Sequence, residues 1–82
     1  YNGWTNYATW RVNLEILGDI QFEDKTSADD LKEIVEDVVF SQYDGMNSLM
    51  YDYASAFISE VNFYEIAENI NEELKLQAEY DN

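Results

Sequence analysis

The chain of 82 residues carries 18 Asp and Glu against 4 Lys and Arg, which gives a formal net charge of −14 at pH 7. Phosphate contacts need clustered Lys and Arg, so this composition argues against direct binding to nucleic acid or to an anionic membrane. The chain also contains no His and no Cys. Disulfides, zinc sites of the usual nitrogen and sulfur type, thiol nucleophiles and imidazole bases are therefore excluded.

Apolar residues make up 46% of the sequence and aromatic residues 16%, which separates the chain from acidic disordered proteins. The absence of Pro and the presence of only 3 Gly favour helices joined by short polar turns. We expect a single acidic domain over residues 1–82, folded as an all-α bundle of three or four helices. Its core is small, so its stability is expected to be modest or helped by association, and a homodimer is one such association.

The first helix is expected from about Thr5 to Leu17, with Thr5 or Asn6 as its N-cap and Gly18 as the glycine just past its end. Apolar residues recur there at helical spacing, at Tyr7, Trp10, Leu14 and Leu17. Part of residues 7–17 also alternates between apolar and polar side chains, as a strand does, so a partly extended segment remains an alternative. Residues 20–25 are expected to form a connector.

The second helix has the clearest pattern. Thr26 and Ser27 are candidates for its N-cap, and it is expected to run to about Phe40. Its apolar residues follow the spacing of one buried face, namely Leu31, Ile34, Val35, Val38 and Val39. Five acidic residues fall on the opposite side of the helical wheel, namely Asp29, Asp30, Glu33, Glu36 and Asp37. One face is therefore predicted to enter the core and the other to be anionic.

A turn at Tyr43, Asp44 and Gly45 is predicted to lead into a third helix, from Asn47 or Ser48 to about Val61. Its buried stripe is expected to contain Met50, Tyr53, Ala54, Phe57 and Val61. Tyr51 and Ile58 lie at the edge of that stripe and are expected to be partly exposed.

Asn62 and Glu65 have the spacing of a capping box, which predicts the start of a fourth helix that runs to about Glu79. The residues expected to face inward are Phe63, Ile66, Ala67, Ile70 and Leu74, and those expected on the outer face are Glu65, Glu68, Glu72 and Glu79.

The aromatic residues divide into a predicted core and a group of candidate contact residues. Trp10, Tyr53, Phe57 and Phe63 are expected in the core. Tyr and Trp often anchor interfaces, and the ones expected to be exposed are Trp4, Tyr7, Tyr43, Tyr51 and Tyr64.

The carboxylates do not form a pattern typical of an enzyme or a metal site. Glycoside hydrolysis needs two carboxyl groups facing across a cleft, one of them in apolar surroundings, whereas the acids here are predicted on solvated helix faces. Residues 44–47 lack the ligand ladder of a calcium loop, and the pairs at 23–24 and 29–30 are ordinary acidic pairs. We therefore expect no catalytic residue, no metal site and no cofactor.

The acidic faces of the second and fourth predicted helices contain unusually little positive charge. Solvated helix faces usually mix Lys with Glu, whereas Glu33 with Asp37 and Glu68 with Glu72 are like-charge neighbours that destabilise a helix by a few tenths of a kcal/mol each. Three explanations fit this pattern: plain solubility, adaptation to high salt, or imitation of nucleic-acid phosphates by carboxylates at i and i+4 spacing, which stand about 6 Å apart along a helix.

The first residues of the chain carry two tryptophans at fixed spacing, in the order Asn2, Gly3, Trp4, Thr5, Asn6, Tyr7, Ala8, Thr9 and Trp10, followed by Val12, Asn13 and Leu14. Residues 2–17, about a fifth of the chain, resemble a family of small proteins of phages, prophages and plasmids that begin N-G-W-x-N-x-x-T-W and mostly have no assigned function. Members usually have Glu at the position of Ala8, where it completes a capping box with Thr5, and this chain departs from them there. The resemblance implies a mobile-element origin, with Trp10 as a core anchor and Thr5 as a cap.

Small acidic proteins of mobile elements are often counter-defence factors, so the resemblance and the charge together favour that class. The hypothesis is a non-enzymatic inhibitor, an anti-CRISPR in the first instance, that binds a CRISPR effector complex or a restriction enzyme in the host cytoplasm. Its expected contact residues are Asp29, Asp30, Glu33, Glu36, Asp37, Glu65, Glu68, Glu72 and Glu79 with Tyr51 and Tyr64. The alternative is an adaptor module that binds a partner or itself through Tyr51 and Ile58 and uses its acids only for solubility or salt adaptation.

Overall fold

The computed structural model of the protein describes residues 1–41 and 47–80. The described elements are α1 (Tyr7–Glu15), the 3-10 helix η1 (Leu17–Asp19), α2 (Ala28–Ser41), α3 (Ser48–Ser59) and α4 (Phe63–Tyr80). This confirms the prediction of a small all-α bundle. The extended alternative for residues 7–17 is wrong, because α1 and η1 cover most of that segment. The predicted turn at residues 43–45 lies outside the described residues.

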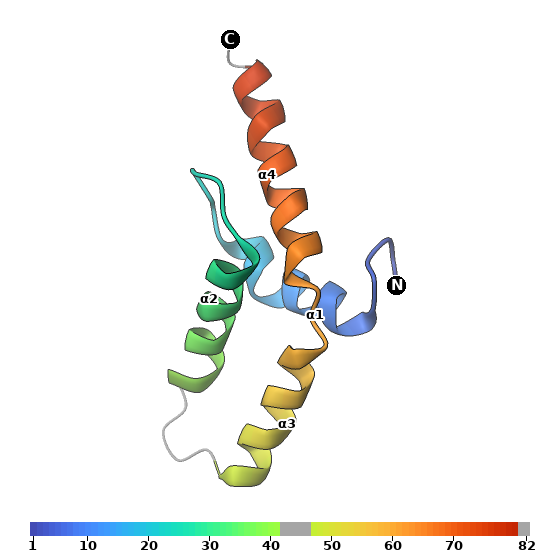
Figure 1. The fold of residues 1–82 in the computed structure, drawn as a ribbon, viewed down its shortest axis with the longest axis vertical. Coiled ribbons are helices and arrows are strands. Elements are labelled where there is room, and N and C mark those ends of the chain that lie inside the picture. The colour runs from blue at the N-terminus through green and yellow to red at the C-terminus, as the bar shows by residue number, and fades with distance from the viewer. Residues whose placement is uncertain (42–46, 81–82) are drawn as a thin grey trace.

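The helices form an elongated molecule of 50 × 26 × 18 Å. Helices α3 and α4 follow one another along the long axis with a bend between them, and α2 runs beside α3 in the opposite direction (Figure 1). Helix α1 lies across the middle, where the other helices meet, and the second half of α4 extends beyond them (Figure 1). The packed centre is therefore short compared with the molecule.

The core lies at this central crossing and takes side chains from every element. Predictions from helical spacing are confirmed for α2 and α4, because Leu31 and Val35 are buried in α2 and Ile66 is buried in α4. Ile34 and Val39 of α2 and Ile70 of α4 are half-buried and pack against it. Val38 and Leu74, also predicted on the inner faces, are half-buried. The full set of buried apolar residues is Ala8, Val12, Leu17, Leu31, Val35, Ile58, Val61, Phe63, Ile66 and Ala67.

Helix α3 differs most from its sequence prediction. Ala54 is half-buried and Val61, just past the helix, is buried, as expected, but Met50 and Tyr53 are exposed to 54% and 69%. Ile58, expected at a partly exposed edge, is buried. The reason is that α3 extends away from the central crossing (Figure 1). Among the described residues, Met50 and Tyr53 are therefore left exposed, while Ile58 lies in a groove lined by α1 and α2.

The chain begins with a tight turn that carries the Asn-Gly pair of the N-terminal motif. Asn2 and Gly3 both have positive φ, at 48° and 88°, and the Trp4 N–H donates to the Tyr1 carbonyl at 2.8 Å. Positive φ at both central residues defines a type I′ turn, for which Asn-Gly is the preferred pair. This turn folds Tyr1 back onto Tyr7 and Trp10, with ring centroids 5.3 and 5.1 Å apart.

Helix α1 is capped by Asn6, whose side-chain oxygen accepts hydrogen bonds from the Thr9 N–H at 2.9 Å and the Thr9 hydroxyl at 2.7 Å. Of the two predicted caps, Asn6 is confirmed, and the cap role that the family resemblance implied for Thr5 is wrong. Trp10 is half-buried, so it lies at the edge of the core rather than at its centre. Trp4 is half-buried as well, although it was expected to be exposed.

The same residues fasten α1 to the bend between α3 and α4. The buried Thr9 hydroxyl accepts from the Asn62 N–H at 2.8 Å, and the Asn6 side-chain amide donates to the Glu60 carbonyl at 2.8 Å. Glu65 accepts from the Thr5 N–H at 2.9 Å. We call this network, made of Thr5, Asn6, Thr9, Glu60, Asn62 and Glu65, the junction.

Only one of the two hydrogen bonds of the predicted capping box forms within the junction. The Asn62 side chain does accept from the Glu65 N–H at 3.1 Å, as predicted. The reciprocal bond, in which the Glu65 carboxylate would accept from the Asn62 N–H, is absent among the described residues, because that N–H donates to Thr9 and Glu65 accepts from Thr5 instead. Glu65 is consequently half-buried rather than on the outer face of α4.

Gly18 has a different role from the predicted one. It lies inside η1 without a positive φ, so it is not the left-handed residue that ends a helix. A Cβ atom at this position would lie 2.7 Å from the Asn13 carbonyl oxygen. Glycine is required here because the backbone of η1 approaches the end of α1 too closely for any side chain.

We expect the buried hydroxyl of Thr9 to contribute more to stability than the exposed hydroxyl of Thr5. Replacing Thr9 by Val preserves shape but leaves the half-buried Asn62 N–H without its acceptor, so Thr9→Val should lower the free energy of unfolding by about 1–3 kcal/mol. Thr5→Val, which removes only an exposed 3.3 Å bond from Asn62, should change it by less than about 0.5 kcal/mol. Urea unfolding of both variants measures the difference, and equal effects would contradict a structural role for Thr9.

Candidate functional site

Four acidic residues of α2 gather along a shallow surface groove of about 450 Å³ that also holds Lys32, Phe40 and Ser41. Asp29, Glu33 and Asp37 are exposed, and Glu36 is half-buried. We call these four residues, Asp29, Glu33, Glu36 and Asp37, the acidic face. Its single nearby cation is Lys32, so the groove has a strong excess of negative charge.

Tyr51 lies next to one end of the acidic face. Its ring packs on Phe40, the apolar residue of the groove, with centroids 4.5 Å apart. Tyr51 is 51% exposed, so it keeps surface available for contact. Of the predicted contact residues, Tyr51 of α3 and the four acids of α2 therefore lie close together in the structure.

The predicted acids of α4 do not form an equivalent surface. Glu68 and Glu72 line a wider groove of about 900 Å³ between α4 and the connector, together with Glu23, Asp24, Lys25 and Lys75. Two lysines among four acids leave less net negative charge there than on the acidic face. The sequence did not predict that Glu23 and Asp24 line this groove, because no periodic pattern indicates which helix a connector will lie against.

The connector is held against α4 by a two-bond contact. The Thr26 N–H donates to the Asn71 side-chain oxygen, and the Asn71 amide donates back to the Thr26 carbonyl, both at 2.9 Å. Ser27 then caps α2 by accepting from the Asp30 N–H at 3.1 Å. The first turn of α2 is therefore fixed to the middle of α4.

The remaining predicted contact residues are separate from both grooves. Asp30 is exposed in the first turn of α2. Tyr64 is 75% exposed near the start of α4, and Glu79 is exposed near its end. Glu65 belongs to the junction, so it is a structural residue rather than a free contact residue.

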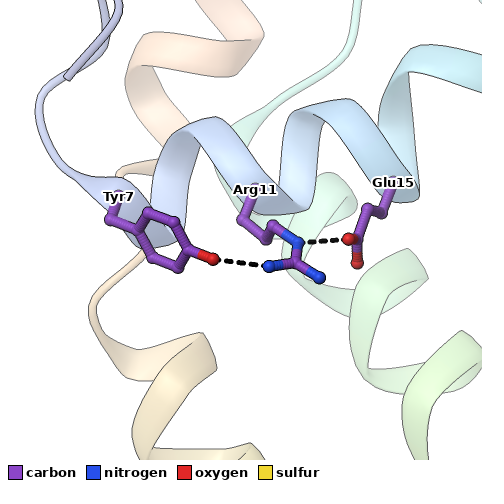
Figure 2. A network of polar contacts seen from close by, with 3 residues as sticks. All are labelled: Tyr7, Arg11 and Glu15. Carbon is purple, nitrogen blue, oxygen red and sulfur yellow. Dashed lines mark hydrogen bonds and ion pairs between the residues drawn. The ribbon is translucent and has the colours of Figure 1, made fainter.

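Helix α1 holds the one ion pair within residues 1–41 and 47–80, between Arg11 and Glu15. Arg11 also donates to the Tyr7 hydroxyl and lies 5.9 Å from the centre of its ring (Figure 2). The hydrogen bond to Glu15, followed by that to Tyr7, raises the pKa of Arg11 above its usual value. The arginine is thus charged and already engaged, and it does not neutralise the acidic face.

The described part of the chain contains no cluster of three or more acidic residues able to hold a metal ion. Across residues 1–41 and 47–80, no helix combines the length and the apolar character needed to cross a bilayer. A comparison with protein-family models, curated proteins and solved structures finds no match for this chain.

Because most carboxylates face solvent without a cation partner, we expect the fold to be stabilised by salt. Raising sodium chloride from about 0.05 to 1 M shortens the screening length from more than 10 Å to about 3 Å, which weakens the repulsion within α2 and α4. The free energy of unfolding should rise by about 1 kcal/mol. The double variant Glu68→Gln with Glu72→Gln should show a smaller rise, and a stability independent of salt would contradict this account.

Proposed function

We propose that the protein is a non-enzymatic inhibitor that binds the basic nucleic-acid groove of a host defence complex, with its carboxylates in place of phosphates. A CRISPR effector complex is the first target to test, and a restriction enzyme is the second. The observation that carries the proposal is the acidic face, where four carboxylates gather in one groove with a single lysine and without an ion pair among the described residues. Such a surface attracts a cationic partner strongly.

The spacing of the acidic face supports the proposal. Asp29, Glu33 and Asp37 are separated by four residues each, so they are about 6 Å apart along the axis and cover about 12 Å in total. Arg and Lys side chains that normally hold successive phosphates can pair with carboxylates placed at such intervals, because Arg forms the same bidentate hydrogen bonds with both groups. Electrostatic attraction also speeds the encounter of the two proteins.

The chemistry of the groove favours α2 over α4 as the main contact. In the groove between α4 and the connector, Lys25 and Lys75 would repel the cations of the partner, whereas only Lys32 does so in the groove of α2. Phe40 and Tyr51 add an apolar end to the acidic face, where a well-packed contact can exclude water. The resemblance of residues 2–17 to proteins of mobile elements supports the counter-defence class and, with it, action in the host cytoplasm.

The adaptor alternative loses part of its basis. It required an exposed edge made by Tyr51 and Ile58, but Ile58 is buried and Tyr51 packs on Phe40 beside the acidic face. Any partner that contacts Tyr51 is therefore also close to the carboxylates of α2.

The test uses purified guide-loaded CRISPR effector complexes and restriction enzymes with labelled target DNA. The protein should reduce DNA binding by one of them, and the inhibition should weaken as salt rises. The double variant Glu33→Lys with Asp37→Lys should raise the inhibitory concentration at least about tenfold while circular dichroism shows an intact fold.

The matched control is Glu73→Lys with Glu79→Lys, which changes the net charge equally but lies outside the acidic face. It should inhibit nearly as well as the natural sequence. If no effector loses DNA binding and no salt-sensitive complex forms with any of them, the proposal is wrong; equal losses for the two double variants would show that bulk charge, rather than this face, is responsible.

A further inference from the structure

Helix α3 has an exposed apolar stripe that begins where Phe57 contacts Tyr7 of α1. Phe57 is half-buried against Tyr7, with ring centroids 6.3 Å apart, and Tyr7 packs in turn on Tyr1 and Trp10. Tyr53 and Met50 follow Phe57 at four and seven residues along the same side of the helix, and they are exposed to 69% and 54%. We call Met50, Tyr53 and Phe57, together with Tyr1, Tyr7 and Trp10, the aromatic stripe.

The sequence of α3 is patterned as if this stripe were buried. Met50, Tyr53, Phe57 and Val61 have the spacing of an inward face, but only Val61 is buried. The other apolar side of α3 already packs within the chain, since Tyr51 meets Phe40 and Ile58 enters the core. The helix therefore has two apolar sides. The described chain packs against one of them, while on the other it covers Phe57 in part and leaves Tyr53 and Met50 exposed.

The charge distribution indicates what covers the other side. Helix α3 contains one charged residue, Asp52, whereas α2 and α4 each contain six. A basic partner would gain little attraction from α3, because the carboxylates lie on the other helices. A second copy of the chain, with its own net charge of −14, is repelled by every acidic surface and can approach most closely where charge is scarce.

We propose that the aromatic stripe is the interface through which two copies of this chain associate. A two-fold arrangement places the stripe of one copy on that of the other, so that Tyr53 of one copy lies against Phe57 and Tyr7 of its partner. Aromatic rings stack favourably in such contacts, and no residue of the stripe has a side-chain carboxylate that would lose its water. The nearest side-chain charge, on Arg11 beside Tyr7, is already paired with Glu15. The acidic face of each copy lies on α2, outside the stripe, and can remain accessible in the dimer.

Salt should affect dimer formation and the binding of a basic partner to the acidic face in opposite directions. Salt screens the mutual repulsion of two anionic copies and strengthens the dimer, while it weakens the attraction between the acidic face and a basic partner. Dimer formation and inhibitor activity can therefore be measured independently, and failure of one does not imply failure of the other.

The experiment is sedimentation equilibrium of the full chain from micromolar to millimolar concentration, at about 0.05 and 0.5 M sodium chloride. We expect a monomer and dimer equilibrium with a lower dissociation constant at the higher salt. Tyr53→Glu should raise that constant at least about tenfold, because it places a charge at the centre of the stripe. The residue is exposed in the monomer, so the circular dichroism spectrum should be unchanged.

The matched control is Tyr64→Glu, which makes the same chemical change at a position on α4 that is 75% exposed and outside the stripe. It should dimerise like the natural sequence after allowance for one added charge. A monomer at every concentration and salt, a dimer that weakens with salt, or equal effects of the two substitutions would each overturn the proposal.

Discussion

The buried hydroxyl of Thr9 is the contact on which the arrangement of this protein depends. It donates to the cap of its own helix and accepts the backbone N–H of Asn62, so one side chain completes both the start of α1 and the bend between α3 and α4. Glu65 and Asn6 add further bonds across the same boundary. Because α1 is only nine residues long, it is too short to be stable alone and needs this attachment. The attachment of α1 to the bend between α3 and α4 therefore depends on this hydroxyl.

A small core and a large negative charge act against each other in this molecule. The buried apolar residues are few and concentrated at the central crossing, whereas the carboxylates extend along the whole of α2 and α4. Repulsion between like charges lowers stability by amounts that matter to a small domain. Ten of the 18 acids lie on those two helices, and α3 contains one. Such segregation gives the surface one region suited to cations and another suited to apolar contact.

Much of the fold could be predicted from periodic patterns, and the errors have physical causes. The faces of α2 and α4 were predicted correctly at Leu31, Val35 and Ile66, because both helices cross the packed centre. The prediction failed at Met50 and Tyr53, since spacing reveals an apolar face but not whether a neighbour covers it. Glu65 and Gly18 were misassigned because their roles depend on Thr5 and Asn13, contacts made only in three dimensions. In the same way, the α2 acids were found from sequence, whereas their proximity to Tyr51 through Phe40 was not.

Helix α4 begins in the packed centre and ends far from it. Phe63, Ile66 and Ala67 are buried in its first turns, while Leu76 and Tyr80 near its end are exposed to 49% and 92%. Its last turn also contains no basic residue, and Glu79 there faces the negative end of the helix dipole. One continuous helix therefore has two local stabilities: its first turns open only when the whole domain unfolds, and its last turns fray on their own. Amide protons should exchange progressively faster along α4, and proteases should cleave its last turns before they reach the core.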